Sequence, residues 1–497
     1  DLDGDGLDAD QEAQLGTSDL SADSDGDGLD DRTEYMDLGL SPTRADTDRD
    51  GLFDAWDATF GNEPRAAAAT ARLHVSMAGG DAHSVAIAAD GTLRAWGSNG
   101  DGQLGIGTFG GNFPSPTAVV GPGNTNFLSD IVSVAAGGSH TLALAADGTV
   151  WAWGNNSYGR LGDGTTVHSA CPVKVAGPGG EGALGNIVAI GAGLSHSVAL
   201  RADGTVWIWG CNDYGRLGDN TTLTRKTPIQ VLGPDGAGFL TNIVAVSSFK
   251  NHTLALRSDG TVWAWGYNQY GRLGDGTTVT RKTPVQVHGV GDTGHLAMVA
   301  AVVAGRQHSL ALLDDGTAVA WGCNGSGRLG DGTADDRHAP VSILDTSGAS
   351  VLSNLTALAA GQNFSAARIA DGTLRTWGAD TYGQLGDDGS AAVWLPVEVK
   401  GEDAQGAFSN AVSIAAGWEH CLAARADGTL WAWGQNGAGR LGDGTTVTRR
   451  TPVIVDFDAD GLRDDYELTY FPSLLYGPTD DPDADGLTIA DEVVPAR

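Results

Sequence analysis

The sequence predicts an all-β fold: a seven-bladed β-propeller of four-stranded blades. The sequence repeats with a period of 56 residues. A fixed period of this length is typical of propellers and solenoids. Each repeat contains four runs of roughly four to seven β-branched or alternating residues bounded by Gly, Asp or Pro, which are strand signals. An Asp-Gly pair recurs at spacings of 57 and then five times 56 residues, at Asp90, Asp147, Asp203, Asp259, Asp315, Asp371 and Asp427.

The strands of one repeat are expected in a fixed order. The first strand covers segments such as 187–190 and 243–246, and in the first repeat 73–77. An Ala-Gly-x-x-His turn leads to the second strand, and the Asp-Gly hairpin turn leads to the third, which contains Trp-Ala-Trp-Gly. A Gly-Arg-Leu-Gly loop then precedes a Pro-led fourth strand, as at 172–175 and 284–287. This order places the His-containing turns and the Gly-Arg-Leu-Gly loops at the same end of every blade.

Residues that recur in every blade are interpreted as structural. The recurrent histidines are expected to form hydrogen bonds, the tryptophans to fill the core between blades, and the arginines to reach the neighbouring blade. A phosphate-binding loop is excluded because it needs Lys after its second Gly, where this chain carries Asp163, Asp219, Asp275 or Asp331. The recurrent residues are His83, His140, His196, His252, His308 and His420, with Phe364 at the seventh position; Trp96, Trp153, Trp209, Trp265, Trp321, Trp377 and Trp433; and Arg160, Arg216, Arg272, Arg328 and Arg440.

The repeats resemble those of a known family. The motif AGLSHSVAL, followed by DGTVWIWG and a GRLGDG-type loop, resembles repeats of the regulator of chromosome condensation family over residues 73–455. The resemblance implies a seven-bladed propeller, but the fold alone does not define an activity. Nucleotide exchange on a small GTPase with chromatin binding is not carried over, because it conflicts with the acidic charge and with the calcium motifs described next.

Charge divides the chain into three parts. The net charge is −33; residues 1–65 hold 20 acidic and 4 basic side chains, and residues 456–497 hold 12 and 2. The remaining residues carry only −7. Nucleic acid is excluded as a partner because phosphate binding needs a basic surface, and no apolar run approaches the roughly 18 residues of a membrane span. The four cysteines are expected to be free, mostly buried thiols.

Both acidic flanks contain a calcium-loop pattern. Residues 23–34 read DSDGDGLDDRTE, with carboxylates at loop positions 1, 3, 5, 9 and 12, Gly at position 6 and a backbone carbonyl at position 7. Alternating oxygens at this spacing can wrap a hard cation. The pattern occurs five times, so up to five Ca²⁺ sites are predicted. The ligands are Asp1, Asp3, Asp5, Leu7 and Glu12; Asp23, Asp25, Asp27, Leu29, Asp31 and Glu34; Asp46, Asp48, Asp50, Leu52, Asp54 and Asp57; Asp456, Asp458, Asp460, Leu462, Asp464 and Glu467; and Asp481, Asp483, Asp485, Leu487 and Glu492.

The flanks also resemble bacterial thrombospondin type 3-like calcium repeats. This resemblance implies extracellular rods in which the metal replaces much of a hydrophobic core. The expected domains are calcium repeats over 1–65, a propeller over 66–455 and calcium repeats over 456–497. The expected location is extracellular or the cell surface of a bacterium. No signal peptide lies in the segment, and we expect the native chain to continue beyond both ends.

Positions that vary between repeats are candidates for partner binding, because variable loops on a rigid scaffold commonly carry function. One such position is the first x of the Ala-Gly-x-x-His turn, assigned to Gly80, Gly138, Leu194, Lys250, Arg306, Gln362 and Trp418. Another precedes a loop glycine and holds Tyr158, Tyr214, Tyr270 and Tyr382. Tyr, Trp and Arg are common interface anchors, so the tyrosines, Leu194, Lys250, Arg306 and Trp418 are the candidate contacts. Packing of each tyrosine on a neighbouring loop is the alternative.

These observations favour a non-enzymatic extracellular calcium-binding protein, in which the propeller is an interaction or structural module on a calcium-stabilised stalk. Its partner would be a protein or a surface glycan, and the stalks could self-assemble into fibres. The alternative is a secreted inhibitor that caps an enzyme with the aromatic rim. A propeller enzyme acting on polysaccharide or peptide ranks last, because no nucleophile–base pair stands out from the repeats.

We predict that both flanks lose structure when calcium is removed, because grouped carboxylates repel one another without a cation. Circular dichroism of the full chain with Ca²⁺ and with excess chelator tests this. The difference spectrum should disappear when the aspartates at loop positions 1 and 3 are changed to Ala in all five loops. Spectra that do not respond to the chelator would contradict the prediction.

Overall fold

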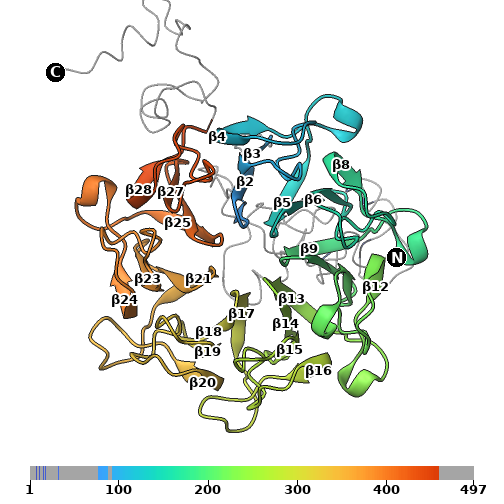
Figure 1. The fold of residues 1–497 in the computed structure, drawn as a ribbon. Helices are drawn as coiled ribbons and strands as arrows, with labels where there is room; N and C mark the ends of the chain where they lie inside the picture. The colour runs from blue at the N-terminus through green and yellow to red at the C-terminus, as the bar shows by residue number, and fades with distance from the viewer. Residues whose placement is uncertain are drawn as a thin grey trace, which may run out of the picture. The chain divides into compact units, whose positions relative to one another are not determined.

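The structure, a computed structural model, describes residues 76–87 and 92–457 together with five single positions nearer the N-terminus, 7, 11, 15, 17 and 32. Between residues 77 and 454 the chain forms seven four-stranded sheets arranged in a ring, which confirms the predicted propeller (Figure 1). Of the predicted calcium ligands, only Leu7 and Asp456 are described, and the others lie outside the described residues.

Each blade is built from four consecutive strands. The bounds in blades 1 to 4 are β1 (Met77–Gly79), β2 (His83–Ile87), β3 (Leu93–Ser98) and β4 (Asn112–Ala118); β5 (Ile131–Ala136), β6 (His140–Ala145), β7 (Val150–Gly154) and β8 (Ser169–Lys174); β9 (Ile187–Ala192), β10 (His196–Arg201), β11 (Val206–Gly210) and β12 (Arg225–Gln230); and β13 (Ile243–Ser248), β14 (His252–Arg257), β15 (Val262–Gly266) and β16 (Arg281–Gln286). Within each blade the strands pair in sequence order.

The other three blades repeat this arrangement. Short 3-10 turns follow four of the outer strands in the propeller, and a fifth lies between β11 and β12. The strands are β17 (Val299–Ala304), β18 (His308–Leu313), β19 (Ala318–Gly322) and β20 (Arg337–Ser342); β21 (Leu355–Ala360), β22 (Phe364–Ile369), β23 (Leu374–Gly378) and β24 (Val393–Glu398); and β25 (Ala411–Ala416), β26 (His420–Arg425), β27 (Leu430–Gly434) and β28 (Arg449–Ile454). The 3-10 turns are η3 (Pro122–Asn124), η4 (Pro178–Gly180), η5 (Asp213–Gly215), η6 (Pro234–Gly236) and η7 (Glu402–Ala404).

The expected strand positions are confirmed except at some ends. The outer strands start about three residues before the predicted Pro-led segments, because pairing with the third strand resumes beyond a register shift, as at Gly154↔Ser169. The first described strand starts at Met77, whereas the sequence predicted residues 73–77, of which 73–75 lie outside the described part of the chain. The ring itself is unaffected, because seven complete blades are present.

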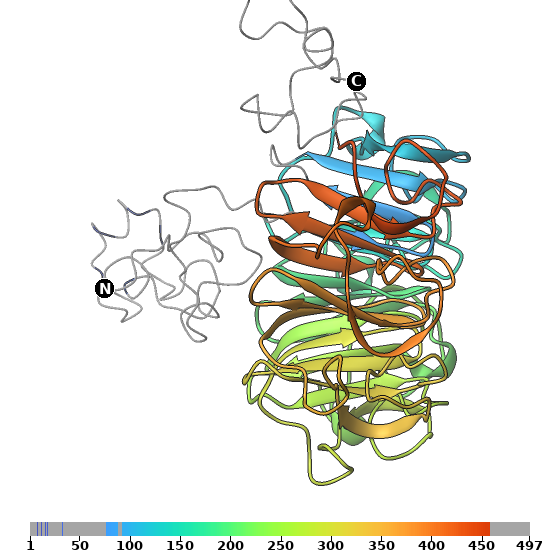
Figure 2. The ribbon, with the colours of Figure 1, turned by 90° about the vertical axis from the view of Figure 1, so that its left-hand side faces the viewer.

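The innermost strands surround the axis. β1, β5, β9, β13, β17, β21 and β25 each contact the next, and β25 contacts β1 to close the ring. Figure 2 shows the propeller from its edge, with the blades layered around the axis. Because every blade has four strands, β1 enters and β28 leaves on the same face. We call the opposite face, which carries the His-containing turns and the Gly-Arg-Leu-Gly loops, the loop face.

One backbone carbonyl joins each blade to the next. In the Gly-Arg-Leu-Gly loop of blade 4, the Arg272 carbonyl accepts hydrogen bonds from Trp321 Nε1 and Ser309 Oγ of blade 5, both at 2.8 Å. Ser309 Oγ also lies 2.9 Å from His252 Nε2. All seven core tryptophans donate to the equivalent carbonyl of the preceding blade. The tryptophans and histidines therefore have the predicted structural role.

The six histidines are neutral side chains inside these joints. Each lies fully buried, with Nε2 within 3.3 Å of a Ser or Thr hydroxyl of the following blade. A Ser or Thr hydroxyl that donates its proton to a carbonyl can only accept from the histidine, so Nε2 carries the proton. Nδ1 is then the unprotonated nitrogen of the imidazole. Burial lowers the pKa of all six, and that of His83 to about 3. None is suited to exchange protons near neutral pH.

The joint between blades 6 and 7 is the exception. Phe364 replaces the histidine, and Cys421 replaces the Ser or Thr of the partner strand; both side chains are fully buried. A polar pair has thus been exchanged for an apolar one, so no donor is left unsatisfied. Cys421 is a free thiol, as are Cys171, Cys211 and Cys323, which confirms the expectation of free cysteines.

The same interactions close the ring between the last and first blades. The Arg440 carbonyl of blade 7 accepts from Trp96 Nε1 and Ser84 Oγ of blade 1, at 2.9 and 2.8 Å. Just after β28, Phe457 packs edge-on against Trp96 with 6.2 Å between ring centres.

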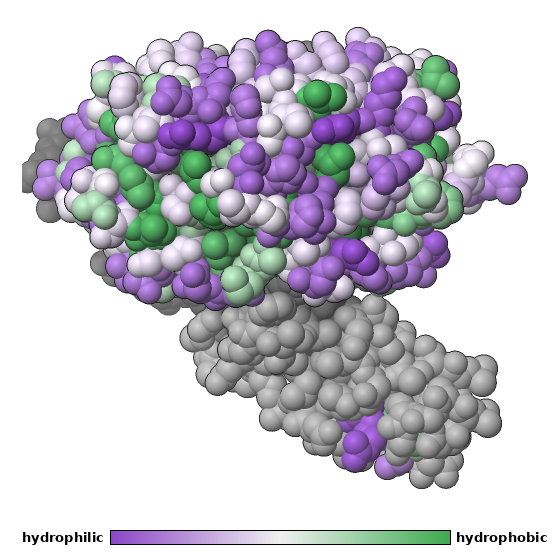
Figure 3. Space-filling view, turned by 90° about the horizontal axis from the view of Figure 1, so that it is seen from below, coloured by the Kyte–Doolittle hydropathy of each residue, from purple (hydrophilic) through white to green (hydrophobic). Residues whose placement is uncertain are grey.

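The outer edge near β16 and β20 shows hydrophobic and hydrophilic residues interspersed (Figure 3). In the described part of the chain, no helix has the length and hydropathy for a membrane span.

We predict that replacing one joint histidine destabilises the propeller. His308 is fully buried and lies 2.9 Å from Ser365 Oγ. His308→Ala leaves a cavity and should lower the free energy of unfolding by about 2–4 kcal/mol. His308→Phe copies blade 6 and should cost about 1 kcal/mol, the loss of one hydrogen bond. Denaturant unfolding measures both, with exposed His338→Ala as a control; equal effects of the Ala and Phe variants would contradict the prediction.

Candidate functional site

The turns between the first and second strands meet at the centre of the loop face. In blade 2, Gly137 N–H donates to the His140 carbonyl at 2.8 Å, and five other blades repeat this bond. A Cβ at Gly137 would lie only 2.2 Å from the His140 ring and 2.5 Å from the Gly193 carbonyl of the next blade. The glycine is therefore required by close packing, and the residue that follows it is the first one free to vary.

This geometry corrects the sequence register in blade 1. Gly80 was assigned to the variable position, but Gly80 N–H donates to the His83 carbonyl and so occupies the glycine position. The variable residue is Asp81, whose carbonyl accepts from Arg440 Nη1 at 2.8 Å, just as the Leu194 carbonyl accepts from Arg160. The error arose because Gly79 and Gly80 make two alignments of the turn possible in the sequence.

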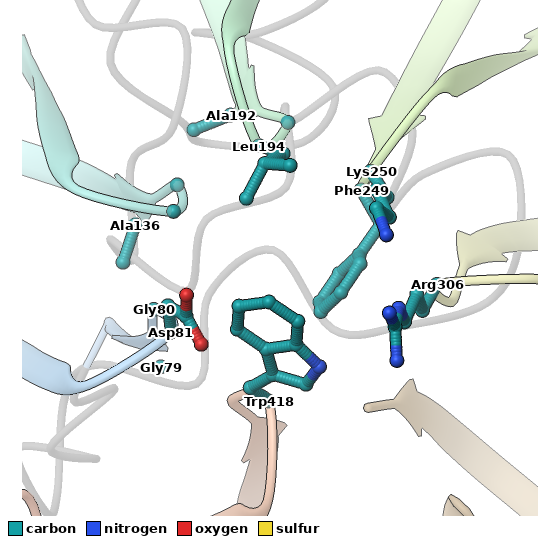
Figure 4. A pocket seen from close by; sticks show the side chains of 13 residues that line it. Gly79, Gly80, Asp81, Ala136, Ala192, Leu194, Phe249, Lys250, Arg306 and Trp418 are labelled. Carbon is teal, nitrogen blue, oxygen red and sulfur yellow. The ribbon is translucent and has the colours of Figure 1, made fainter. Parts of the chain in front are cut away.

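The variable side chains form a compact cluster on the loop face. Figure 4 shows them pointing into the central opening, where a pocket is lined by residues of six blades. We call the six larger side chains the funnel mouth: Asp81, Leu194, Phe249, Lys250, Arg306 and Trp418. The enclosed part has room for only about one or two water molecules. The structure thus brings together the predicted Leu194, Lys250, Arg306 and Trp418.

Phe249 and Asp81 are the two members that sequence reasoning missed. Phe249 stands where other blades have the turn glycine, so its ring enters the opening that glycine leaves empty elsewhere. The signal was present in the sequence as Ser-Phe-Lys in place of Ala-Gly-x. Asp81 was missed through the register error described above.

Charge at the funnel mouth is only partly solvated. Burial raises the pKa of Asp81 from 3.8 to about 6, against the nearby Arg440, which lowers it. Burial also raises the pKa of Glu419 and lowers that of Lys250. Each of these charges is therefore less stable here than in water. Such perturbed groups are typical of functional sites, although structural clusters show them too.

Two buried donors at the funnel mouth have no acceptor. Trp418 Nε1 and Arg306 Nε are shielded from solvent and make no hydrogen bond. The Arg306 guanidinium lies 5.2 Å from the centre of the Trp418 ring, within the range of a cation–π interaction. Leaving a buried donor unpaired costs about 1–3 kcal/mol. A partner that supplied acceptors here would recover part of that cost.

Five buried arginines surround the funnel mouth. Four donate to the carbonyl of a variable residue of the next blade, as Arg272 Nη1 does to the Arg306 carbonyl at 3.0 Å, which confirms their predicted reach between blades. Arg328 is the exception, because its Nη1 donates to Gln307 Oε1 of its own blade. Burial lowers the pKa of all five, to about 10 for Arg160 and Arg272, and none forms a described ion pair. The loop face therefore rests on five guanidiniums that form no ion pair in the described part of the chain, while more distant carboxylates, such as Asp81 and Glu419 for Arg440, offset part of their charge.

The predicted tyrosines lie on the same face, outside the funnel mouth. Tyr158 and Tyr214 are exposed, at 45% and 46%, while Tyr270 and Tyr382 are half-buried. The Tyr214 ring stacks on Tyr267 with 4.3 Å between centres, a contact that sequence reasoning missed because Tyr267 stands where other blades have small or polar residues. Packing on a neighbouring loop, the alternative to partner contact, thus occurs at Tyr214, although its ring is also exposed.

Within residues 76–87 and 92–457, no cluster of three or more His, Cys, Asp or Glu side chains could hold a metal ion. The predicted calcium ligands belong to the flanks. The funnel mouth therefore has the character of a binding surface that mixes cations, aromatic rings and one carboxyl group.

We predict that Asp81→Asn stabilises the propeller at neutral pH. The folded-state pKa of Asp81 is raised to about 6, so folding favours the protonated form of this side chain. The contribution of Asp81 to folding stability is therefore complete below pH 3.8 and is lost as the pH rises through 6. After allowance for partial exposure, Asn should gain about 1 kcal/mol at pH 7.5 and nothing at pH 3.5. Thermal unfolding at both values tests this. Asp315→Asn should act oppositely, because hydrogen bonds from Thr317 lower the pKa of Asp315; a pH-independent effect of Asp81→Asn would contradict the prediction.

Comparisons with known proteins agree with this fold. The chain is 31% identical over 383 residues to the ultraviolet-B receptor UVR8 of Arabidopsis thaliana, covering 76% of this chain and 81% of that protein. It is 31% identical to the human E3 ubiquitin-protein ligase HERC2 over 376 residues, but spans only 7% of HERC2. The crystal structure of Prp20p from Saccharomyces cerevisiae matches with a TM-score of 0.57 and 26% identity, covering 73% of this chain and 85% of that chain.

These relatives overturn two expectations. They are named as a receptor, a ubiquitin ligase and a protein studied for binding to Gsp1p and histones, not as extracellular calcium-binding proteins. The predicted extracellular calcium-binding function and the predicted cell-surface location are therefore wrong. The physical reason is that ligand spacing reports on cation coordination and carries no information about the compartment. The receptor relative agrees with the broader prediction of a binding propeller.

Profiles of one family match nearly the whole propeller. The profile described as RCC1-like domain matches residues 34–400, and profiles of the regulator of chromosome condensation (RCC1) repeat match residues 411–440 and 427–462. The seven blades and the recurrent His, Trp and Arg contacts agree with that match. The chain therefore belongs to the RCC1 family of repeat propellers.

Proposed function

We propose that this chain is a protein-binding module whose partner docks on the loop face, anchored at the funnel mouth. One observation carries the proposal. Seven repeats that are otherwise nearly alike place chemically different residues at one position, and those of six repeats line a single opening. A position required only for the fold would keep one residue type, as the joint tryptophan does.

The size and chemistry of the funnel mouth favour a protein over a small molecule. A drug-sized ligand needs a pocket of about 300–1,000 Å³, far more than the enclosed space of about one or two waters. Trp418, Phe249 and Arg306 are residue types that commonly anchor protein interfaces. The unpaired donors of Arg306 and Trp418 and the ring of arginines favour acceptor groups, so the contacting segment of the partner should be acidic.

The relatives support a protein partner. Prp20p is described by its binding to Gsp1p and histones, and the chain covers 85% of that structure. Neither the described residues nor the relatives support a glycan partner or self-assembly. The loop face is also opposite the face on which β1 enters and β28 leaves the ring, so neither of these strand ends lies on it.

Calcium binding by the flanks is a second proposal, which rests on ligand spacing alone. The domain division into 1–65, 66–455 and 456–497 has the same basis in the sequence. Neither proposal requires a particular location, and the funnel mouth contains none of the predicted calcium ligands. The two proposals can therefore be tested separately.

Binding of purified Gsp1p to the full chain tests the first proposal. Biolayer interferometry should give a measurable Kd, and Arg306→Ala and Trp418→Ala should each weaken binding by roughly tenfold or more, the loss of one anchor. The melting temperature should change little, because removal of an unpaired buried donor offsets the loss of the cation–π contact between the two side chains. Thr373→Ala, at an Asp-Gly turn on the opposite face, is the control. Wild-type affinity in both funnel-mouth variants would overturn the proposal, and undetectable binding would exclude this partner.

A further inference from the structure

The contact between blades 1 and 2 on the loop face departs from the repeat at four positions. Asp101 stands where other blades have Tyr, Ser or Ala, and Asn155 stands where they have Ser, Cys, Tyr, Ala or Gln. Ser157 is the only serine at its position, where the others are Gly, Asp, Gln or Thr, and the later blades carry no histidine at the position of His168. All four departures occur at one place, which indicates a role that the repeat does not need.

These four residues are joined by three hydrogen bonds and one ion-pair contact. Ser157 Oγ lies 3.1 Å from His168 Nε2, and His168 Nδ1 lies 3.4 Å from Asp101 Oδ1. The arrangement is serine to imidazole to carboxylate, with each imidazole nitrogen facing one partner. A carboxylate beside Nδ1 favours the Nδ1–H tautomer, in which Nε2 is the nitrogen that can accept the serine proton.

Asn155 fixes both ends of the chain. Its Nδ2 donates to Asp101 Oδ1 at 3.1 Å, and its Oδ1 accepts from the Ser157 backbone N–H at 3.0 Å. The carboxylate from blade 1 and the serine from blade 2 are therefore held by the same amide. Ser157 is exposed, and the side chains of His168 and Asp101 are 35% and 33% exposed, so a reagent can reach all three.

We propose that Ser157 is an activated nucleophile, with His168 as its general base and Asp101 as a positioning residue, and that the site takes small activated esters as substrates. This activity is additional to protein binding and uses none of the funnel-mouth residues. It was not foreseen from the sequence, because Asp101 and Ser157 are 56 residues apart and only the contact between blades joins them.

The reaction balances as acyl transfer followed by hydrolysis. Ser157 Oγ forms a bond to the ester carbonyl carbon while its proton passes to His168 Nε2. The bond to the leaving phenolate or alkoxide breaks, and that oxygen takes the proton from His168. Water then attacks the acyl-serine, again losing its proton to His168, which returns it to Ser157 Oγ as the carboxylic acid leaves.

The surroundings limit the substrate class. The exposed Tyr158 ring, next to Ser157 in the chain, offers an apolar surface for an aryl or acyl group, and the Arg160 guanidinium lies 5.6 Å from the centre of that ring. This buried charge would favour a developing oxyanion, although Arg160 is already bonded to the Leu194 carbonyl. Esters with good leaving groups need the least stabilisation of this kind, so they are the expected substrates.

Covalent labelling of the full chain tests the proposal. A fluorophosphonate reagent should form an Oγ–P bond at Ser157 with loss of fluoride, detected by tandem mass spectrometry. His168→Gln should slow labelling by about 100-fold, as expected for loss of a general base, and Asp101→Asn should slow it less. Hydrolysis of p-nitrophenyl acetate should fall in the same order and be lost in Ser157→Ala.

Blade 6 supplies a matched control. Thr381 occupies the position of Ser157, but Ala392 stands at the position of His168, so this blade has a hydroxyl without a base. Thr381→Ala should therefore leave labelling and hydrolysis unchanged, and circular dichroism should show every variant folded. The proposal is overturned if Ser157 reacts no faster than the serine at position 326, or if His168→Gln labels at the wild-type rate in a folded protein.

Discussion

The structure depends on one backbone carbonyl in each Gly-Arg-Leu-Gly loop, or in the Gly-Gln-Leu-Gly loop that replaces it in blades 1 and 6. That carbonyl accepts the indole N–H of the next blade at all seven joints and, at most of them, a Ser or Thr hydroxyl as well. A four-stranded sheet cannot bury both of its faces alone, and these bonds fix the angle at which neighbouring blades cover each other. The glycines around the loop, such as Gly162 with its φ of +70°, give the backbone the bend that brings the carbonyl into place.

This constraint determines where the chain can vary. Side chains that fill or bond across the joints are nearly fixed, and the one altered joint changes both partners together, from His and Ser or Thr to Phe364 and Cys421. The first free position is the residue after the turn glycine, which faces the axis. The propeller therefore concentrates side-chain variation at the funnel mouth. The loops at one contact between blades can also carry different side chains without disturbing the other joints.

The funnel mouth is a costly arrangement for the isolated protein. Burial raises the pKa of Asp81, Trp418 and Arg306 leave buried donors unpaired, and the five surrounding guanidiniums form no ion pair in the described part of the chain. Residues selected only for stability would not be expected to combine these features. A partner that brings acceptors and negative charge would satisfy the unpaired donors and offset the charge of the guanidiniums, which is the physical basis of the proposed binding function.

The sequence by itself determined the propeller, the number of blades, the strand order and the structural role of the recurrent His, Trp and Arg, because these follow from periodicity and local turn chemistry. It also named Leu194, Lys250, Arg306 and Trp418 as candidates. Only the tertiary structure placed Asp81 and Phe249 beside them, since one depended on hydrogen-bond register and the other on an exception to the turn motif. The Ser157–His168–Asp101 chain was likewise decided by the packing of two blades, because no local pattern indicates which side chains from different repeats will face each other across a joint.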